Sequence, residues 1–214
     1  YLNNGTANPW SGVGSNIADE NSSTRAVALG DVDSDGDLDL VAGNQMALNR
    51  LYLNNGTSDP YDSGSNITED VYNTSSTALG DVDGDGHLDL VLGNYAQPNR
   101  LYINNGTANP WLGVTGSNIT DYSDNTNAVA LGDVDGDGDL DLVTGNEGPN
   151  RLYLNNGTSD PWGGASGSDI TTDSHLTQSI ALGDVDSDGD LDLVTGSDSS
   201  PLRLYLNNGT SDPW

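Results

Sequence analysis

A set of short motifs recurs along this chain at nearly constant spacing. Leu-Gly-Asp occurs four times, starting at Leu29, Leu79, Leu131 and Leu182, at intervals of 50, 52 and 51 residues. A second motif, Tyr-Leu/Ile-Asn-Asn-Gly-Thr, occurs five times, starting at Tyr1, Tyr52, Tyr102, Tyr153 and Tyr205. A period of this length predicts one supersecondary unit per repeat, with neighbouring units stacked on one another. We therefore expect a single domain over residues 1–214, with repeats at about 24–76, 77–126, 127–177 and 178–214, the last completed by 1–23.

Each repeat is predicted to form four short β-strands. In the first repeat three of them cover 26–32, 38–43 and 50–54, and a Ser-Asn/Asp-Ile segment supplies the fourth. An Asn-Gly pair follows the third strand and predicts a tight two-residue hairpin turn. No stretch shows a 3.6-residue period, so the chain is expected to be all-β. Tandem four-stranded units are typical of β-propellers, which predicts a propeller of four blades, each of about 51 residues.

The closure of the ring has several possible forms at this stage. The segment around Ile17 is expected to supply the fourth strand of the last blade and so to join the two ends of the chain. Half of an eight-blade ring and a segment of a longer array are the alternatives. Tyr1–Asn4 and Tyr205–Asn208 compete for one strand position, which leaves a surplus strand. An unpaired strand predicts self-association, either head to tail in filaments or as paired rings.

A nine-residue loop rich in aspartate begins at the Asp of each Leu-Gly-Asp. Aspartate stands at positions 1, 3, 5 and 9 of all four loops, and glycine stands at position 6, where the chain must turn sharply. Carboxylates at this spacing converge when the chain curls, and with the carbonyl of position 7 they form the all-oxygen shell that Ca²⁺ prefers. Position 7 is His87 in the second repeat, which fits a ligand that acts through its backbone. The predicted ligands are Asp31, Asp33, Asp35, Asp37 and Asp39; Asp81, Asp83, Asp85, His87 and Asp89; Asp133, Asp135, Asp137, Asp139 and Asp141; and Asp184, Asp186, Asp188, Asp190 and Asp192, with Asp37, His87, Asp139 and Asp190 acting through backbone oxygen.

About four Ca²⁺ ions, one per repeat, are therefore expected. An EF-hand is excluded because position 12 of each loop lacks the bidentate Glu of such sites and holds Ala42, Leu92, Thr144 or Thr195. Mg²⁺ is disfavoured because it keeps more of its water. The other reading is a set of acidic surface turns without metal, and four identical patterns argue against it.

The residues from 130 to 157 resemble a known family. Ala-Leu-Gly-Asp-Val-Asp-Gly-Asp-Gly-Asp-Leu-Asp-Leu-Val-Thr-Gly-Asn at 130–146, followed by Asn-Arg-Leu-Tyr-Leu-Asn-Asn-Gly at 150–157, is similar to the FG-GAP/VCBS repeats. These are calcium-binding propeller blades also seen in integrin alpha chains and some fungal lectins. The resemblance covers essentially the whole chain and implies calcium in the hairpin loop, an extracellular or cell-surface location, and adhesion to protein or carbohydrate. One departure is that the family's familiar rings have seven blades, whereas this chain has four repeats.

Charge and composition exclude several other classes of function. The chain carries 33 acidic residues, five arginines and no lysine, for a formal net charge of −28. Such a surface repels nucleic acid, and no apolar run reaches the ~20 residues needed for membrane insertion. There is no cysteine, and the two histidines, His87 and His175, stand at different repeat positions. We therefore expect a non-catalytic protein, with a metal-dependent hydrolase as the weakest alternative.

Two further sets of residues are candidates for surface function. Nine Asn-x-Ser/Thr sequons are candidate glycosylation sites: Asn4, Asn21, Asn55, Asn66, Asn73, Asn105, Asn118, Asn156 and Asn208. Aromatic residues that follow proline are candidates for stacking on sugars, although packing on a neighbouring blade is the favoured explanation: Trp10, Tyr61, Trp111, Trp162 and Trp214. The leading hypothesis is a calcium-binding, extracellular structural or adhesion module that self-assembles. A glycan-binding lectin is the alternative.

Overall fold

The computed structural model describes residues 16–18, 21–61, 63–120, 123–170 and 174–214. These ranges contain β-strands and no helix, which confirms the all-β prediction, and accordingly none of their segments forms a helix that could cross a membrane. The strands are β1 (Thr24–Gly30), β2 (Asp39–Tyr52), β3 (Ser65–Gly80), β4 (Asp89–Asn94), β5 (Arg100–Tyr102), β6 (Ser117–Asn118), β7 (Thr126–Gly132), β8 (Asp141–Gly148), β9 (Arg151–Tyr153), β10 (Ser168–Asp169), β11 (His175–Gly183), β12 (Asp192–Ser197) and β13 (Arg203–Tyr205). The segment Tyr1–Asn4 and the candidate Trp10 lie outside the described residues.

Each repeat forms an antiparallel unit in which consecutive strands pair. In the second repeat the C-terminal part of β3 pairs with β4, β4 with β5, and β5 with β6. The register places Leu90 opposite Tyr102, and Leu101 opposite Ser117. The third repeat has the same order in β7, β8, β9 and β10, and the fourth has it in β11, β12 and β13.

The strand that follows each aspartate loop is the most buried of its unit. All six residues of β4 are buried. Leu90 and Leu92 contribute to one apolar cluster and Val91 to the next, because a neighbouring unit covers each face of the strand. An almost continuous apolar run is typical of strands covered on both faces.

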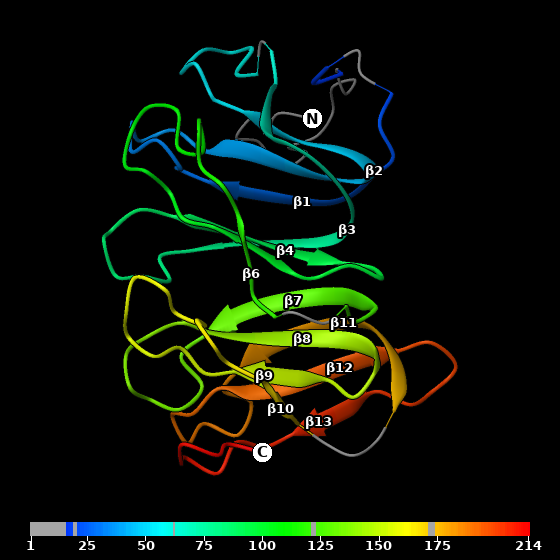
Figure 1. The fold of residues 1–214 in the computed structure, drawn as a ribbon. Coiled ribbons are helices and arrows are strands. Elements are labelled where there is room, and N and C mark those ends of the chain that lie inside the picture. Colours follow the sequence, from blue (N-terminus) through cyan, green and yellow to red (C-terminus); the bar gives the residue numbers. More distant parts are fainter. Residues whose placement is uncertain (1–15, 19–20, 62, 121–122, 171–173) are drawn as a thin grey trace, which may run out of the picture.

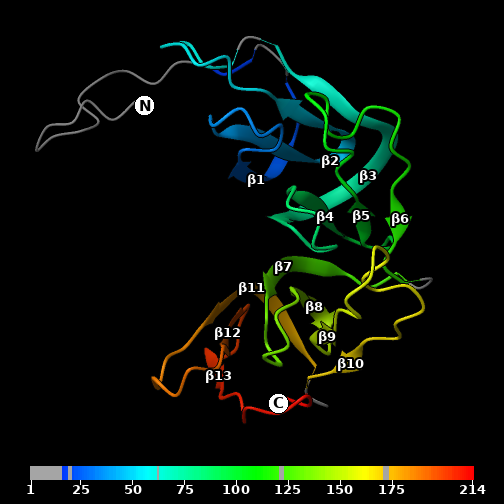
Figure 2. The same cartoon turned by 90° about the vertical axis from the view of Figure 1, so that its left-hand side faces the viewer.

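The units are stacked in chain order and form an arc. Figure 1 shows the first unit, with β1 and β2, at one end of the stack and the last unit, with β12 and β13, at the other. The view at right angles shows the stack curving (Figure 2). Hydrogen bonding joins β1 to β6 into one sheet and β7 to β13 into a second. β3 crosses the repeat boundary predicted at 76/77, so the division into repeats remains a prediction.

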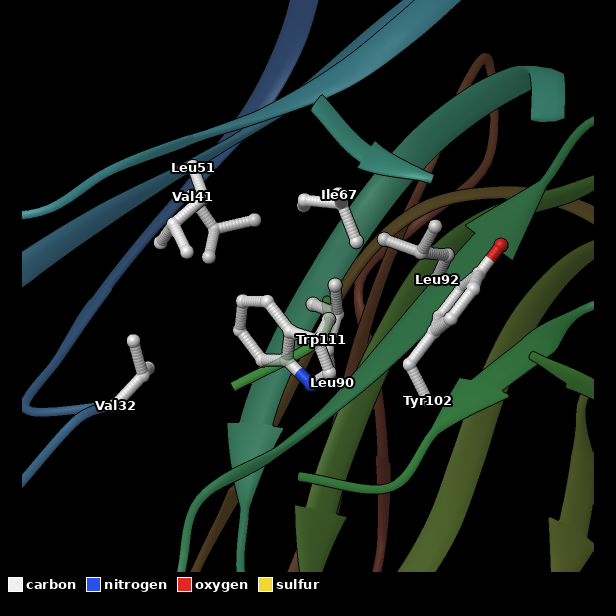
Figure 3. Close-up of a cluster of buried hydrophobic side chains, with 8 residues drawn as sticks. All are labelled: Val32, Val41, Leu51, Ile67, Leu90, Leu92, Tyr102 and Trp111. Carbon is white, nitrogen blue, oxygen red and sulfur yellow. The ribbon is translucent and has the colours of Figure 1, made fainter. Parts of the chain in front are cut away.

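Successive units meet in three apolar junctions. In the first junction Val32, Val41, Leu51 and Ile67 of one unit pack against Leu90, Leu92, Tyr102 and Trp111 of the next (Figure 3), with Leu79 and Leu88 at the edge of the second set. We call the first set the trailing face of a unit and the second set, with its two edge leucines, the leading face. The corresponding residues form the second and third junctions, except that Thr144 and Thr195 replace Leu92. The core is therefore divided among junctions between units, and an inner unit contributes a face to two of them.

The segment around Ile17 does not complete the last unit, so the predicted closure of a four-blade ring is wrong. Ile17 is exposed, and Ala18 packs against Leu40 and Tyr52 of the first unit. Among the described strands, β13 pairs only with β12. Four units curve through too small an arc to bring the last unit to the first (Figures 1 and 2).

The repeated Asn-Gly pair forms a wider loop than the predicted two-residue turn. Such a turn needs positive φ at both central residues, and of Asn55 and Gly56 only the glycine has it, at 69°. The backbone N–H of Asn55 donates to the carbonyl of Pro60 at 3.0 Å and so closes a loop of several residues.

Candidate metal centres

An aspartate loop joins the first two strands of every unit. The loops lie between β1 and β2, β3 and β4, β7 and β8, and β11 and β12. The glycine at position 6 has φ between 91° and 100° in all four loops, a conformation that other residues rarely adopt. The glycine predicted to permit the turn is therefore required there by the backbone.

The carboxylate at position 1 curls the loop around itself. In the first loop Asp31 accepts the backbone N–H of Asp35 at 3.1 Å and that of Gly36 at 3.0 Å. In the other three loops the position 1 aspartate also accepts the N–H of the glycine at position 6. The spacing between positions 1 and 6 thus has a local mechanical cause, because these bonds stabilise the curl that brings the carboxylates together.

The carboxylate at position 9 is buried and ties the loop to the third strand of its unit. Oδ2 of Asp39 accepts the N–H of Val32 at 2.9 Å, and Oδ1 accepts the N–H of Asn54 at 2.7 Å. The other three loops repeat both bonds. A carboxylate oxygen has a second lone pair, so an oxygen that accepts one N–H can still face a cation.

Carboxylate oxygens converge in all four loops. Each loop has a cluster in which three aspartates place one oxygen apiece within 4.8 Å of the others: Asp31, Asp33 and Asp39; Asp81, Asp83 and Asp85; Asp133, Asp135 and Asp141; and Asp184, Asp186 and Asp192. Oδ1 of Asp33 is buried and has no hydrogen-bond partner. A buried carboxylate oxygen is costly unless a donor or a cation faces it. The donor set therefore fits a hard divalent cation.

Positions 5 and 7 differ from the clustered positions. Only the second loop brings its position 5 aspartate, Asp85, into the cluster, although the position 5 aspartate of every loop accepts the N–H of position 7. The position 7 side chain lies against the glycine of the Asn-Asn-Gly loop, so that a Cβ on Gly106 would lie 2.9 Å from Nε2 of His87. A side chain turned in this direction leaves only the backbone of position 7 for a cation.

Burial raises the pKa of several of these carboxyl groups. Desolvation is the largest cause at position 3, where the charges of neighbouring aspartates also raise the pKa of Asp33, Asp83, Asp135 and Asp186. At position 9, desolvation raises the pKa of Asp89 and Asp141 to about 6, against the lowering effect of their backbone hydrogen bonds. Asp192 in the last unit is different, because its backbone hydrogen bonds lower its pKa. A cation bound in an inner loop would therefore compete with protons near neutral pH.

The aromatic residues proposed for sugar stacking lie mostly in the junctions. Trp111 and Trp162 are each 2% exposed and pack in the first and second junctions, so the structure does not support sugar stacking on their faces. Trp214 packs against the third junction, and the hydroxyl of Tyr61 donates to the carbonyl of Leu38 at 3.0 Å.

The sequons lie mainly on exposed loops and edges. Seven are exposed, namely Asn21, Asn55, Asn66, Asn105, Asn118, Asn156 and Asn208, whereas Asn73 is half-buried and Asn4 lies outside the described residues. Exposure is a condition for glycosylation and does not establish it.

One functional residue of each loop was missed at the sequence level. The first Asn of the Asn-Asn-Gly motif donates its backbone N–H to the position 9 carboxylate, and in the second to fourth units its side chain reaches the preceding unit. Nδ2 of Asn104 donates to the carbonyls of Val32 at 2.8 Å and Leu88 at 3.0 Å. The signal was available, because a two-residue turn explains only the second Asn and the Gly of the motif.

Comparison with known families agrees with this geometry. A family model described as FG-GAP-like repeat matches residues 31–92, 81–144 and 133–195, so each match spans two successive aspartate loops and the strands between them. The chain belongs to the FG-GAP-like repeat family. The resemblance drawn from the sequence is thereby confirmed. No curated protein matches the chain.

Solved structures with a similar fold differ widely in the functions that their descriptions name. A lectin of Agrocybe aegerita, described as recognising non-reducing terminal N-acetylglucosamine, matches with TM-score 0.59 and 18% identity over 88% of this chain and 50% of its own. BBS1N in complex with ARL6DN matches with TM-score 0.55 and 13% identity over 86% of this chain and 54% of its own. The V. cholerae biofilm matrix protein Bap1 matches with TM-score 0.45 and 18% identity over 88% of this chain and 32% of its own. This FG-GAP-like chain thus spans about half the length of the first two, and the likeness concerns the fold alone.

Proposed function

We propose that this chain is a calcium-binding β-propeller module that holds four Ca²⁺ ions, one in each aspartate loop. The observation that carries the proposal is the convergence of three carboxylates in every loop, with a buried Asp33 oxygen that has no partner. The ligands in each loop are the aspartates of positions 1, 3, 5 and 9 and the backbone oxygen of position 7, as the sequence predicts. The clusters contain no histidine or cysteine, which favours calcium over the transition metals.

The work of the ion in this proposal is structural. Several carboxylates within nine residues repel one another, and a divalent cation removes that repulsion. Because the position 9 carboxylate also holds the third strand through Asn54 or its counterpart, the ion stabilises the unit beyond its own loop. An ion that binds only the folded state adds about 2.7 kcal/mol per site at a hundredfold excess over its dissociation constant.

The module acts outside the cell as a structural or adhesion element and has no catalytic activity. Family membership supports this placement. The aspartates that could serve a hydrolase already accept loop and strand N–H groups, and His87 lies against Gly106. The exposed sequons are proposed as glycosylation sites in that setting.

Glycan binding is the second candidate function. The fold shared with the Agrocybe aegerita lectin favours it. The burial of Trp111 and Trp162 counts against the aromatic mode of sugar binding, so any glycan site uses other residues. Binding of N-acetylglucosamine, measured by titration, would support this second candidate.

Calcium titration into chelator-treated, desalted protein tests the main proposal. Isothermal titration calorimetry is expected to give about four ions per chain. Asp135→Asn removes a position 3 ligand and is expected to lower the stoichiometry by about one ion. Asp59→Asn, an exposed aspartate outside the loops, is the matched control and leaves the stoichiometry unchanged. No binding, or equal stoichiometry in the two variants, would overturn the proposal.

A further inference from the structure

The leading face of the first unit carries two exposed leucines. Leu29 is 59% exposed and Leu38 is 55% exposed. Their counterparts in the second unit, Leu79 and Leu88, pack at the edge of the first junction. The first unit thus exposes this pair of leucines at the edge of its leading face, whereas Leu40 and Tyr52 on the same face are each 7% exposed.

Inside the chain, each such pair of leucines is seated over a glycine of the preceding unit. A Cβ on Gly30 would lie 2.8 Å from Cδ1 of Leu88 and 2.9 Å from Cδ1 of Leu79. Gly80 and Gly132 receive the leucine pairs of the third and fourth units at 2.8 to 2.9 Å. The counterpart in the last unit is Gly183, and no described atom lies within 4 Å of a Cβ placed there. We call the space over this glycine the seat. In the first three units a leucine pair from the next unit fills the seat, and in the last unit the seat at Gly183 is open.

The trailing face of the last unit is exposed as well. Val185 and Leu204 are 52% and 51% exposed, whereas their counterparts in the first three units are all 5% exposed or less. Those counterparts are Val32, Val82 and Val134, and Leu51, Leu101 and Leu152. Apolar residues that are core in three copies of a repeat and exposed in the fourth indicate a face that lacks its partner.

One hydrogen bond crosses every internal junction. At each end of the chain, one of its two groups lacks, within the described part of the chain, the partner that it has inside the chain. Asn104, Asn155 and Asn207 each donate from Nδ2 to the carbonyl of the preceding unit's loop valine, at 2.7 to 2.8 Å. In the first unit the equivalent residue is Asn54, and among the described residues its Nδ2 donates only to the carbonyl of Leu38. The equivalent carbonyl acceptor at the other end of the chain is that of Val185.

The missing fourth strand of the last unit has a candidate at the other end of the chain. In the first three units the Arg of the third strand faces the second residue of the Ser-Asn/Asp-Ile segment, as Arg50 faces Asn66. Asn16–Ala18 belongs to the same motif, and Ala18 packs on Leu40 and Tyr52 of the leading face. The counterpart of Ile17 in the first junction is Ile67, which packs with Leu92 and Tyr102, whereas Ile17 itself is 46% exposed. Asn16–Ala18 therefore lies on the face that the fourth strand of a preceding unit would contact, with Ala18 in place of Ile17 packed against it.

We propose that the trailing face of the last unit binds the leading face of the first unit of a second copy of this chain. Leu29 and Leu38 of one copy fill the seat at Gly183 of the other, Asn54 donates to the carbonyl of Val185, and Asn16–Ala18 lies beside β13 as its fourth strand. The occupant is a second copy because this chain already contains the same junction three times. The inference rests on the structural role proposed above and names another copy of the chain as the partner.

The junction between copies differs from the first two internal junctions in one polar contact. Inside the chain, Nδ2 of Asn49 donates to Oγ1 of Thr74 in the next unit at 3.0 Å, and Asn99 donates to Thr126 in the same way. The last unit has Leu202 at this position, 77% exposed. An apolar contact therefore replaces a polar one. The two faces of the contact are different surfaces, so copies either close a ring through two such junctions or continue head to tail.

Sedimentation of the full chain in calcium, over about 1 to 100 µM, tests this proposal. The wild type is expected to associate, and Leu29→Ser combined with Leu38→Ser is expected to weaken the association at least tenfold. Gly183→Val, which fills the seat, has the same expected effect. Leu112→Ser replaces a leucine that is 78% exposed and lies outside the junction, and it associates like the wild type. A wild type that stays at 22.2 kDa throughout, or equal weakening by Leu112→Ser, would overturn the proposal.

A cross-linking experiment identifies the contacting faces. The chain has no cysteine, so Leu38→Cys and Gly183→Cys introduce single thiols. Oxidation of a mixture of the two variants is expected to give a disulfide-linked pair that contains one copy of each, detected by mass. Random or absent cross-linking contradicts the assigned faces. Calcium titration of the same variants separates the two proposals, because a failed junction leaves calcium binding intact, whereas absent calcium binding overturns the proposed function.

Discussion

At the scale of single residues, each aspartate loop divides its work among positions. Position 1 holds the curl of the loop, position 9 holds the third strand, and in the first loop position 3 presents a buried oxygen, Oδ1 of Asp33, that has no hydrogen-bond partner. The same side chains thus build the loop and leave lone pairs for a cation. Substitutions within a single loop can separate these roles.

Asp141→Asn is expected to destabilise the protein more than Asp139→Asn in the same loop. Asp141 accepts the N–H of Val134 at 3.0 Å and that of Asn155 at 2.8 Å, and an amide retains only one acceptor oxygen for the two donors. A buried donor left without a partner costs about 1–3 kcal/mol. Asp139 at position 7 is the matched control, with an expected change within about 0.5 kcal/mol. Urea unfolding in saturating calcium measures both variants, and equal effects would contradict the assigned roles.

The raised pKa of Asp89 and Asp141 predicts how stability depends on pH. Because their pKa rises from 3.8 to about 6 on folding, the metal-free folded state binds protons more tightly than the unfolded state. The free energy of unfolding in chelator therefore falls as pH rises from about 4 to about 6. In calcium the trend is expected to weaken or reverse, because the ligands must lose their protons to bind.

Melting temperatures at about pH 5 and about pH 7, in chelator and in calcium, test this pH dependence. The chelated protein is expected to melt at the higher temperature at about pH 5. The difference is expected to be smaller in Asp141→Asn, and Asp139→Asn serves as its control. A chelated wild type that melts higher at about pH 7 would contradict the shifts.

Much of the residue-level account could be predicted from the sequence. The 1-3-5-9 spacing and the glycine at position 6 are local features, so the convergence of carboxylates in each loop could be predicted from them alone. The hydrogen bond by which Asp39 holds the third strand could not be predicted, because its partner Asn54 is 15 residues away. Nor could the bond from Asn104 to Val32, which spans 72 residues and depends on how two units stack.

At the scale of strands and loops, stability comes from faces that repeat. Leu101 on the trailing face of the second unit is 4% exposed, whereas Leu204, its counterpart in the last unit, is 51% exposed. Leu101→Ala is expected to cost about 2–5 kcal/mol of unfolding free energy, because it leaves a cavity in the second junction. Leu204→Ala is expected to cost less than about 1 kcal/mol in dilute protein. Similar losses in the two variants, measured by denaturant unfolding, would show that the junctions are not the core.

The sequence predicted the strands better than their lengths or their turns. Alternation and turn residues placed strands on both sides of every aspartate loop, as observed. The sequence did not predict that β2 and β3 are long strands, each of which pairs with two different neighbours, or that β6 and β10 have only two residues each. Pairing with neighbouring strands decides where a strand ends. The Asn-Gly turn was wrong because the chain continues to Pro60 before the loop closes.

At the scale of the whole molecule, four similar units form an arc with unlike ends. The sequence predicted that the segment around Ile17 completes the last unit of the same chain, whereas in the structure Ala18 packs against the first unit. Because the Ser-Asn/Asp-Ile motif is nearly the same in every repeat, the sequence alone does not show which unit this segment contacts. The curvature of the stack, which leaves the first and last units apart, excludes closure within one chain (Figure 2). The apolar contrast at Val185 and Leu204 likewise appears only once the junctions are known.

Calcium as the ion that stabilises every unit is the central claim, and thermal unfolding tests it directly. The melting temperature of the full chain is compared in excess calcium and in excess chelator at neutral pH. Four sites, each adding about 2.7 kcal/mol at a hundredfold excess of ion, predict a large fall of the melting temperature in chelator. Restoring calcium reverses the fall, and magnesium restores less of it. An unchanged melting temperature in chelator would contradict the account.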